Sequence, residues 1–266
     1  MKLTDANDEV VKQQVREYWN AHPCGTQFTH LEWGSKQFFD EVERFRYDTQ
    51  PFMRELMEFG NFSGKRLLEI GCGLGTDLLQ FARGGAIATG VDLTAASIEL
   101  VKKRFALEGL PVDARVADAE NLPFADASFD VVYSFGVLHH TPNTQKSIDE
   151  VYRVLKPGGR IIIMLYHKDS IHVYLGAPLF RITHKLHAGA GSLVEDWVRV
   201  YDGAENPLGK AYSKSELRKM FWRFRDLRFA ACDPMRRKYP AAVNWINQKF
   251  LSRQWGFWMV IKGTKA

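Results

Sequence analysis

Residues 67–77 read LLEIGCGLGTD and place three glycines between an apolar run and a segment that can start a helix. The glycines have the spacing GxGxG, which differs from the GxGxxG of dinucleotide-binding folds. Glycine lets the chain turn sharply and lets a ligand lie against bare backbone, and a helix N-terminus offers unpaired N–H groups. We interpret this loop as a ligand-binding turn, with a plain strand-to-helix turn as the alternative.

Strand-like and helix-like segments alternate on both sides of this loop. The strand-like runs are short and apolar, and they read RLLEI, ATGVDL, DARVADA, FDVVYSF and RIIIMLY. Helices are expected from about residue 76, over 95–106 and over 144–155, with a turn at 156–159. Continuously apolar strands are typical of a parallel sheet that helices cover on both faces. The alternation therefore predicts an α/β fold with a doubly wound, Rossmann-like sheet.

The two ends of the chain do not follow this alternation of strands and helices. Residues 8–20 and 35–60 have helical spacing, with a break before Pro51, and we expect residues 1–60 to form an N-terminal helical cap or lid. Residues 168–212 are too many for a simple connection after the fifth strand, which predicts a substrate-covering insertion. A capping box at residues 213–216 predicts a helix over about 214–224, followed by strands at 226–232 and 255–263.

Composition narrows the class of protein. The formal net charge is +5, and basic residues gather in the last third, from Arg218 to Lys238. They could attract the phosphate of nucleic acid or of a small anion, but a solvated helix face with nearby counter-charges is the preferred interpretation. The sequence has no apolar run long enough to span a bilayer, and its polar N-terminus argues against a secretory signal. Three widely separated cysteines give no disulfide framework, so we expect a cytoplasmic protein.

Two carboxylates follow strands next to the glycine loop. Asp92 ends the second strand, 17 residues after Gly75, where a carboxylate can accept hydrogen bonds from both hydroxyls of a ribose. Asp118 follows the third strand, where it can accept a hydrogen bond from an adenine amino group. The loop has no GK[ST] sequence, which excludes a Walker-type triphosphate site. These features predict a nucleoside-containing ligand at the carboxyl edge of the sheet.

Residues 65–166 resemble the class I S-adenosylmethionine-dependent methyltransferases, in the broad methyltransferase type 11 group that includes the ubiquinone and menaquinone methyltransferases. The matching stretches are LLEIGCGLGTD (67–77), GVDLT (90–94), ADAENLPFADASFDVVYSFGVLHH (117–140) and RVLKPGGRIIIM (153–164). The resemblance implies a seven-stranded, mostly parallel sheet whose last strand inserts antiparallel beside the fifth. It also implies a methyltransferase domain over residues 61–266, with S-adenosylmethionine as cofactor and S-adenosylhomocysteine as product.

The resemblance further implies which residues bind the cofactor. The loop glycines would approach its amino-acid portion, Glu69 its ammonium group and Asp92 its ribose. Aromatic residues of the cap could stabilise the sulfonium cation, although a plain docking helix explains them equally well. The cofactor-binding residues expected on this basis are Glu69, Gly71, Gly73, Gly75, Asp92, Leu93, Asp118, Ala119, Ser134, Phe135, Tyr18 and Tyr47.

The stretch GVLHHTPN (136–143) supplies the first catalytic candidates, His139 and His140. Either side chain could be a general base for methyl transfer, and the choice between base and pocket wall stays open. Tyr166 and His167 end the fifth strand and are the second candidates. The pair at 184 and 187 has helical ligand spacing but no identifiable third ligand, so we expect no metal.

Three classes of function remain. We expect a methyltransferase that acts on a small, hydrophobic or aromatic acceptor. The runner-up is an RNA methyltransferase, because the stretch 122–140 also resembles the tRNA wobble-uridine methyltransferases and the last third is basic. The third is a dehydrogenase or a cofactor-binding protein without turnover, and the GxGxG spacing disfavours the dehydrogenase.

Overall fold

One mixed sheet forms the centre of the computed structural model, which describes residues 3–183, 192–203, 205–235 and 241–266. The strands follow the order β3-β2-β1-β4-β5-β8-β7, with β6 beside β5 off this path. Strands β1 to β5 pair in parallel, whereas β8 runs antiparallel to both β5 and β7. The bounds are β1 (Arg66–Ile70), β2 (Ile87–Asp92), β3 (Asp113–Val116), β4 (Phe129–Phe135), β5 (Leu155–His167), β6 (Ala211–Tyr212), β7 (Phe224–Cys232) and β8 (Trp258–Lys265).

Apolar residues of the central strands alternate between two cores, one on each face of the sheet. Leu67 and Tyr133 belong to the core that α4 (Thr76–Arg83) and α5 (Ala95–Glu108) cover. Leu68 and Val132 belong to the other core, under α6 (Thr144–Val154) and α9 (Lys214–Met220). Neighbouring residues of a strand point to opposite faces, so a strand buried on both faces must be apolar at every position. The doubly wound α/β prediction is confirmed, including the antiparallel insertion of the last strand beside β5.

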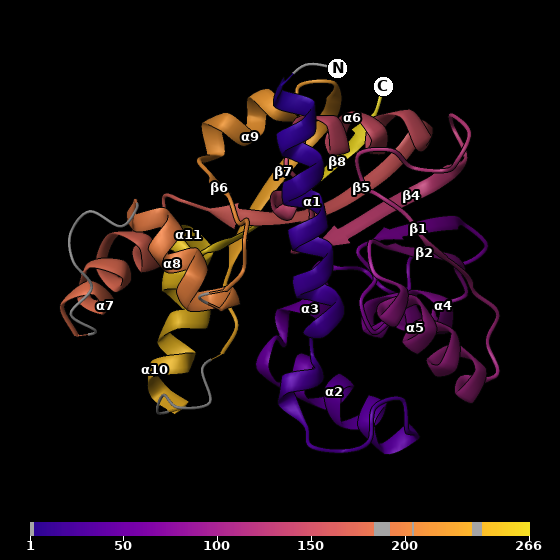
Figure 1. The fold of residues 1–266 in the computed structure, drawn as a ribbon, viewed down its shortest axis with the longest axis horizontal. Coiled ribbons are helices and arrows are strands. Elements are labelled where there is room, and N and C mark those ends of the chain that lie inside the picture. Colours follow the sequence, from indigo (N-terminus) through magenta and orange to yellow (C-terminus); the bar gives the residue numbers. More distant parts are fainter. Residues whose placement is uncertain (1–2, 184–191, 204, 236–240) are drawn as a thin grey trace.

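The remaining helices lie at the two ends of the chain and in the insertion. Helix α1 (Leu3–Ala21) crosses the middle of the view in Figure 1, with α4 and α5 on one side and α7 (Ala177–Thr183), α8 (Leu193–Asp202) and α10 (Ala241–Ile246) on the other. The N-terminal region continues with α2 (Lys36–Thr49) and α3 (Phe52–Leu56), and α11 (Ser252–Trp255) precedes β8. Short 3-10 turns span Thr26–Phe28 and Leu138–His140, and π-helical turns span His172–Gly176 and Asn247–Leu251.

Three local predictions need correction. The sheet has an eighth strand, because the two residues of β6 pair in parallel with Tyr166 and His167 at the end of β5. Residues 156–159 lie inside β5 rather than in a separate turn, and the pairing shifts there from Leu155 opposite Phe129 to Arg160 opposite Val131. The capping box at 213–216 is present, but α9 ends at Met220 instead of near residue 224.

Candidate functional site

A cavity of about 330 Å³ lies at the carboxyl ends of β1, β2, β4 and β5, and α1 contributes to its wall. This is the edge at which open α/β sheets bind ligands. Ten of the expected site residues line it. They are Glu69, Gly71, Gly73, Asp92, Leu93, Asp118, Ala119, Phe135, His140 and Tyr166.

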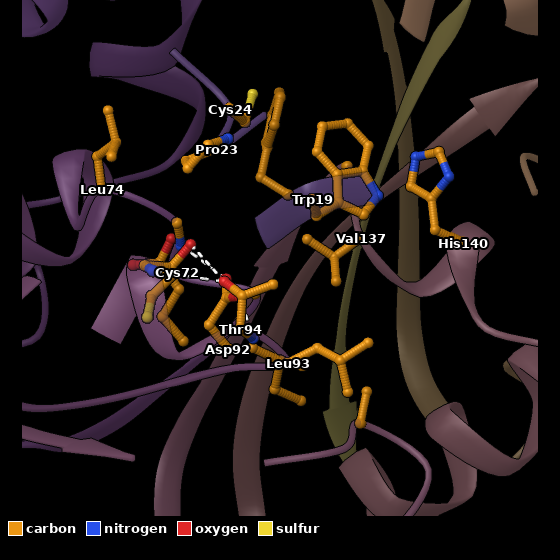
Figure 2. A pocket seen from close by; sticks show the side chains of 18 of the residues that line it. Trp19, Pro23, Cys24, Cys72, Leu74, Asp92, Leu93, Thr94, Val137 and His140 are labelled. Atoms are coloured by element: carbon orange, nitrogen blue, oxygen red, sulfur yellow. Dashed lines mark hydrogen bonds between the residues drawn. The ribbon is translucent and has the colours of Figure 1, made fainter. Parts of the chain in front are cut away.

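The backbone conformation of the glycine loop requires glycine at positions that border this cavity. Gly71 has a φ of +72°, and a Cβ added there would come within 2.2 Å of a methyl carbon of Val137. Gly73 has a φ of +50°, and a Cβ there would meet no atom within 4 Å, because it would project into open space. Asp92 fixes the loop by accepting hydrogen bonds from the N–H of Gly73 (3.0 Å) and from the backbone and side chain of Thr94 (2.9 and 2.8 Å), as Figure 2 shows.

Glu69 brings a buried, unsatisfied carboxylate to the cavity. Its side-chain oxygen Oε2 is buried and has no hydrogen-bond partner among the described residues. Burial raises the pKa of Glu69 well above its ordinary value, and the nearby Asp77 carboxylate adds to the rise. An unpaired buried carboxylate costs free energy unless a donor or cation reaches it. Glu69 is therefore suited to bind an ammonium group.

A cation lies near this carboxylate. Arg46 of α2 lines the cavity and donates two hydrogen bonds to Asp77, at 2.8 and 2.5 Å. Asp77 also accepts hydrogen bonds from the hydroxyls of Tyr47 and Tyr133, at 2.9 and 2.7 Å. The guanidinium of Arg46 lies 5.2 Å from the ring centroid of Phe135. The cavity wall thus carries a fixed positive charge that could bind a carboxylate.

Asp118 is already bonded on both oxygens. One accepts from the backbone N–H of Glu120 (2.8 Å), and the other accepts from the ammonium of Lys12 on α1 (2.7 Å). Lys12 lies also 3.0 Å from a carboxylate oxygen of Glu120. Burial lowers the pKa of Lys12, but the hydrogen bonds to the two carboxylates outweigh it, so the pKa is raised. Each carboxylate oxygen has two lone pairs, so Asp118 can still accept a bond from a ligand.

The two adjacent histidines have different surroundings. His139 is fully buried between His140 and Tyr166, with ring centroids 4.2 and 3.9 Å away, and neither of its ring nitrogens has a hydrogen-bond partner among the described residues. Burial lowers the pKa of His139 well below its ordinary value, so this ring is neutral. His140 lines the cavity and makes an edge contact with Trp19, at a centroid distance of 5.6 Å (Figure 2).

The other six expected site residues are not among those that line the cavity. The hydroxyl of Ser134 donates to the carbonyl of Ile70 (2.9 Å), and Nδ1 of His167 lies 3.1 Å from the carbonyl of Gly256. Their polar atoms are thus engaged within the protein, and these side chains support the wall instead of facing a ligand. The expected residues that are not among those lining the cavity are Gly75, Ser134, Tyr18, Tyr47, His139 and His167.

Residues 68–163 match the family described as "Methyltransferase domain". The chain contains a methyltransferase domain. It is similar to the sterol 4-C-methyltransferase of Caenorhabditis elegans, with 40% identity over 126 residues that cover 47% of this chain and 38% of the relative. It is also 40% identical over 106 residues to the 27-O-demethylrifamycin SV methyltransferase of Amycolatopsis mediterranei, covering 38% of each chain. The match therefore spans under two-fifths of the length of these curated relatives.

The fold of the methyltransferase domain recurs in solved structures. The geranyl diphosphate C-methyltransferase of Streptomyces coelicolor, solved with S-adenosyl-L-homocysteine, matches with a TM-score of 0.63 over 96% of this chain and 98% of that one. The sequence identity is 15%, so this likeness concerns the fold alone. A class I, Rossmann-like methyltransferase fold thus agrees with the resemblance that the glycine loop and its acids suggested.

Several cavity residues lie outside the matched residues 68–163. Lys12 and Trp19 come from α1, Arg46 comes from α2, and Asp202 comes from the end of α8. Arg46 and Trp19 could be suspected only as members of an aromatic cap. Lys12 and Asp202 belong to no motif, and only the folded chain brings them to the cavity.

Neither a metal-binding cluster nor a membrane-spanning helix is found among the described residues. The described residues contain no group of three or more His, Cys, Asp or Glu side chains that could hold a metal ion. The histidines at 184 and 187 lie outside the described residues, as do the basic residues 236–238. Arg223, in the basic last third, lies 3.8 Å from a carboxylate oxygen of Asp149. Within the described part of the chain, no helix has the length and apolar character needed to cross a membrane.

Proposed function

We propose that this protein is an S-adenosylmethionine-dependent methyltransferase that acts on a small, hydrophobic molecule. The observation that carries the proposal is the unsatisfied Oε2 of Glu69 beside the glycine loop. The ammonium group of the cofactor would supply the missing donor, and the guanidinium of Arg46 would attract its carboxylate. Asp92, which lines the same cavity, keeps lone pairs for the ribose hydroxyls.

Bound S-adenosylmethionine would supply a methyl group that its sulfonium sulfur already activates. The residues of this chain then have three tasks, which are to align the acceptor with that methyl group, to exclude water and to remove a proton where the acceptor carries one. The rings of Trp19, Phe135 and Tyr166 line the cavity and favour an adjacent cation. His140, which faces the cavity, is the candidate for the proton acceptor.

The acceptor would be largely apolar. The cavity wall includes Phe28, Met164, Tyr201 and Trp258, which provide apolar surface beside the polar residues of the cofactor site. The names of these two relatives indicate methylation of different atoms, "4-C" of a sterol and "27-O" of a demethylrifamycin. They support a small organic acceptor for this chain but leave the acceptor atom to be inferred from the site.

An RNA substrate is the second candidate. The cavity is partly covered by Lys12, Val15 and Trp19 of α1, which leaves little room for a nucleotide that is still joined to its chain. Several basic side chains of the last third lie against aromatic rings, as Arg218 lies 5.6 Å from the ring centroid of Phe229. These observations favour a free small molecule over RNA.

The domain organisation that we propose follows from the same cavity. Residues 1–60 would act as a cap, and residues 168–212 as an insertion that covers the acceptor, on a domain formed by residues 61–266. Both segments contribute side chains to the cavity, Trp19 from the cap and Asp202 from the insertion. We propose a cytoplasmic location, where S-adenosylmethionine is available.

Cofactor binding can be tested without knowing the acceptor. A ligand that binds only the folded state raises the melting temperature in proportion to the logarithm of its concentration above Kd. We expect S-adenosylhomocysteine to raise the melting temperature and NAD to leave it unchanged. Stabilisation by NAD alone would overturn the proposed function and favour a dehydrogenase.

A further inference from the structure

Two hydrogen-bond acceptors face each other at one end of the cavity. Nε2 of His140 lies 3.7 Å from Oδ2 of Asp202, which is longer than a hydrogen bond. Both residues line the cavity, and only 6% and 7% of their side chains are exposed. Oδ2 of Asp202 is buried and has no hydrogen-bond partner among the described residues. Each of these two atoms can therefore accept a hydrogen bond from a group in the cavity.

The tautomer of His140 is fixed by its other nitrogen. Nδ1 lies 2.5 Å from the carbonyl oxygen of Leu208, and a carbonyl oxygen can only accept a hydrogen bond. The amide nitrogen of Asn206, which can only donate, lies farther from Nδ1, at 3.4 Å. The shorter contact with the carbonyl of Leu208 places the hydrogen on Nδ1, which leaves the lone pair of the neutral ring on Nε2. That lone pair points to the side of the ring where Asp202 lies. His140 is thus prepared to accept a proton from a group placed beside Nε2.

Two other elements hold Asp202 in place at the end of α8. Oδ1 accepts a hydrogen bond from the hydroxyl of Tyr166 on β5 (2.6 Å), and the backbone carbonyl accepts one from the hydroxyl of Tyr18 on α1 (2.7 Å). A Cβ at the next residue, Gly203, would come within 2.7 Å of the Tyr18 hydroxyl, so a glycine is required there. Burial raises the pKa of Asp202, and the neighbouring His140, Tyr166 and Asn206 oppose the rise.

We propose that the methyl acceptor carries a hydroxyl group that donates a hydrogen bond to Nε2 of His140, beside Oδ2 of Asp202, and that His140 removes its proton. This inference rests on the proposed function and names the chemical class of the acceptor. As the acceptor oxygen forms its bond to the methyl carbon of S-adenosylmethionine, the bond from that carbon to sulfur breaks and leaves its electron pair on sulfur. The hydroxyl proton passes to Nε2, and the carboxylate of Asp202 stabilises the imidazolium that forms.

A hydroxyl fits this pair better than an amine or a carbon acceptor. A buried carboxylate beside an amine would stabilise the protonated ammonium form, which has no lone pair to attack the methyl group. A hydroxyl is neutral when it binds, and it becomes acidic only as the new bond forms, so a base beside it is needed at that moment. A carbon acceptor offers no polar donor to Nε2 of His140.

The first experiment detects a hydrogen bond to Nε2 of His140 and does not require methyl transfer. Nitrogen NMR of the protein with labelled histidine and bound S-adenosylhomocysteine, with the His140 signal assigned by its loss in His140→Gln, reports the hydrogen bond that Nε2 accepts. We expect 2-naphthol to shift the Nε2 signal of the wild-type protein but not that of Asp202→Asn, and we expect naphthalene to have no such effect. An equal response to naphthol and naphthalene, or no response to either, would overturn the proposal.

The second experiment identifies the methylated atom. The protein is incubated with S-adenosylmethionine carrying a carbon-13 methyl group and an extract of apolar metabolites, and the product's methyl signal shows which atom it is bonded to. We expect an O-methyl product, with turnover lowered about 100-fold or more in Asp202→Asn and in His140→Gln. A methyl group on carbon, nitrogen or sulfur would contradict the hydroxyl assignment.

A matched control separates this pair from general damage to the fold. His172 and Asp233 form another histidine–carboxylate contact, with Nε2 and Oδ2 3.0 Å apart, and neither residue is among those lining the cavity. His172→Gln should therefore keep its turnover. Calorimetric titration with S-adenosylhomocysteine should give the same Kd for all variants. If S-adenosylhomocysteine fails to bind the wild-type protein, the proposed function fails; if it binds and the methyl goes elsewhere, only this inference fails.

Discussion

At the scale of single residues, Glu69 connects ligand binding with stability. The Oε2 atom of its buried carboxylate lacks a partner and burial raises the pKa of the group, so the folded protein gains stability when this group loses its charge. We expect Glu69→Gln to weaken S-adenosylhomocysteine binding roughly 10- to 100-fold, as the loss of a charged hydrogen bond of about 1.5–3 kcal/mol implies. The melting temperature at neutral pH should stay the same or rise.

Calorimetry and thermal unfolding measure the two effects separately. Glu99→Gln, on an exposed position of α5, is the control and should alter neither value. Tighter binding by Glu69→Gln, or a marked fall in its melting temperature, would show that Glu69 is a structural residue.

Alanine substitutions at two loop glycines test whether the ligand binds at the glycine loop. Gly73→Ala places a methyl group in open space of the cavity, so the apo protein should lose only the left-handed backbone penalty of about 1–2 kcal/mol. Gly71→Ala adds a clash with Val137 and should destabilise the fold much more. We expect Gly73→Ala to fold and yet to bind S-adenosylhomocysteine weakly. Unimpaired binding by a folded Gly73→Ala would move the ligand away from this loop.

The sequence predicted those site residues whose position follows from a local pattern. The glycine loop and Asp92 directly follow buried strands, so a strand-end rule was enough to place them. Ser134, Tyr47 and His139 also follow from strand or helix positions, but their rotation toward the interior depends on packing that a single segment does not reveal. Asp202 lies close to His140 although the two residues are 62 positions apart in the sequence, and no motif predicts this contact.

At the scale of elements, Lys12 joins α1 to the turn after β3. Its ammonium bonds Asp118 and lies close to Glu120, whose side chain is 3% exposed. Removing one partner of a buried pair leaves an uncompensated charge, which costs on the order of 3 kcal/mol. Lys12→Met should therefore speed amide hydrogen exchange in α1 by at least about 10-fold while the central strands keep their protection.

Lys36→Met provides the control for that comparison, because Lys36 bonds Asp40 on the exposed surface of α2. Exposed pairs contribute about 0–1 kcal/mol, so exchange in α1 should not respond. Equal exchange in α1 of Lys12→Met and of the wild-type protein would show that the salt bridge does not hold the cap.

The elements that the sequence predicted correctly are those with strong periodic or capping signals. The central strands are rich in apolar residues, and Ser213 and Glu216 form the capping box that starts α9. The errors occur where tertiary pairing overrides local signals. Residues 156–159 have the composition of a turn but belong to β5. Strand β6 forms where residues 211 and 212 pair with the end of β5.

At the scale of the whole molecule, the cavity combines three parts of the chain. Residues 68–163 supply the glycine loop and the acids, the N-terminal region supplies Trp19 and Arg46, and the segment after β5 supplies Asp202. The domain's pattern identifies the cofactor class, because the loop and Asp92 lie within the matched residues. The acceptor depends on the other two parts, whose sequence carries no comparable signature.

The central claim is methyl transfer to a small molecule, and tracing a labelled methyl group tests it most directly. The purified protein is incubated with labelled S-adenosylmethionine and a cell extract separated into RNA and apolar metabolites. We predict that label enters the metabolite fraction and that its transfer falls about 100-fold or more in His140→Gln. Label found in the RNA fraction, or in neither fraction, would contradict the account.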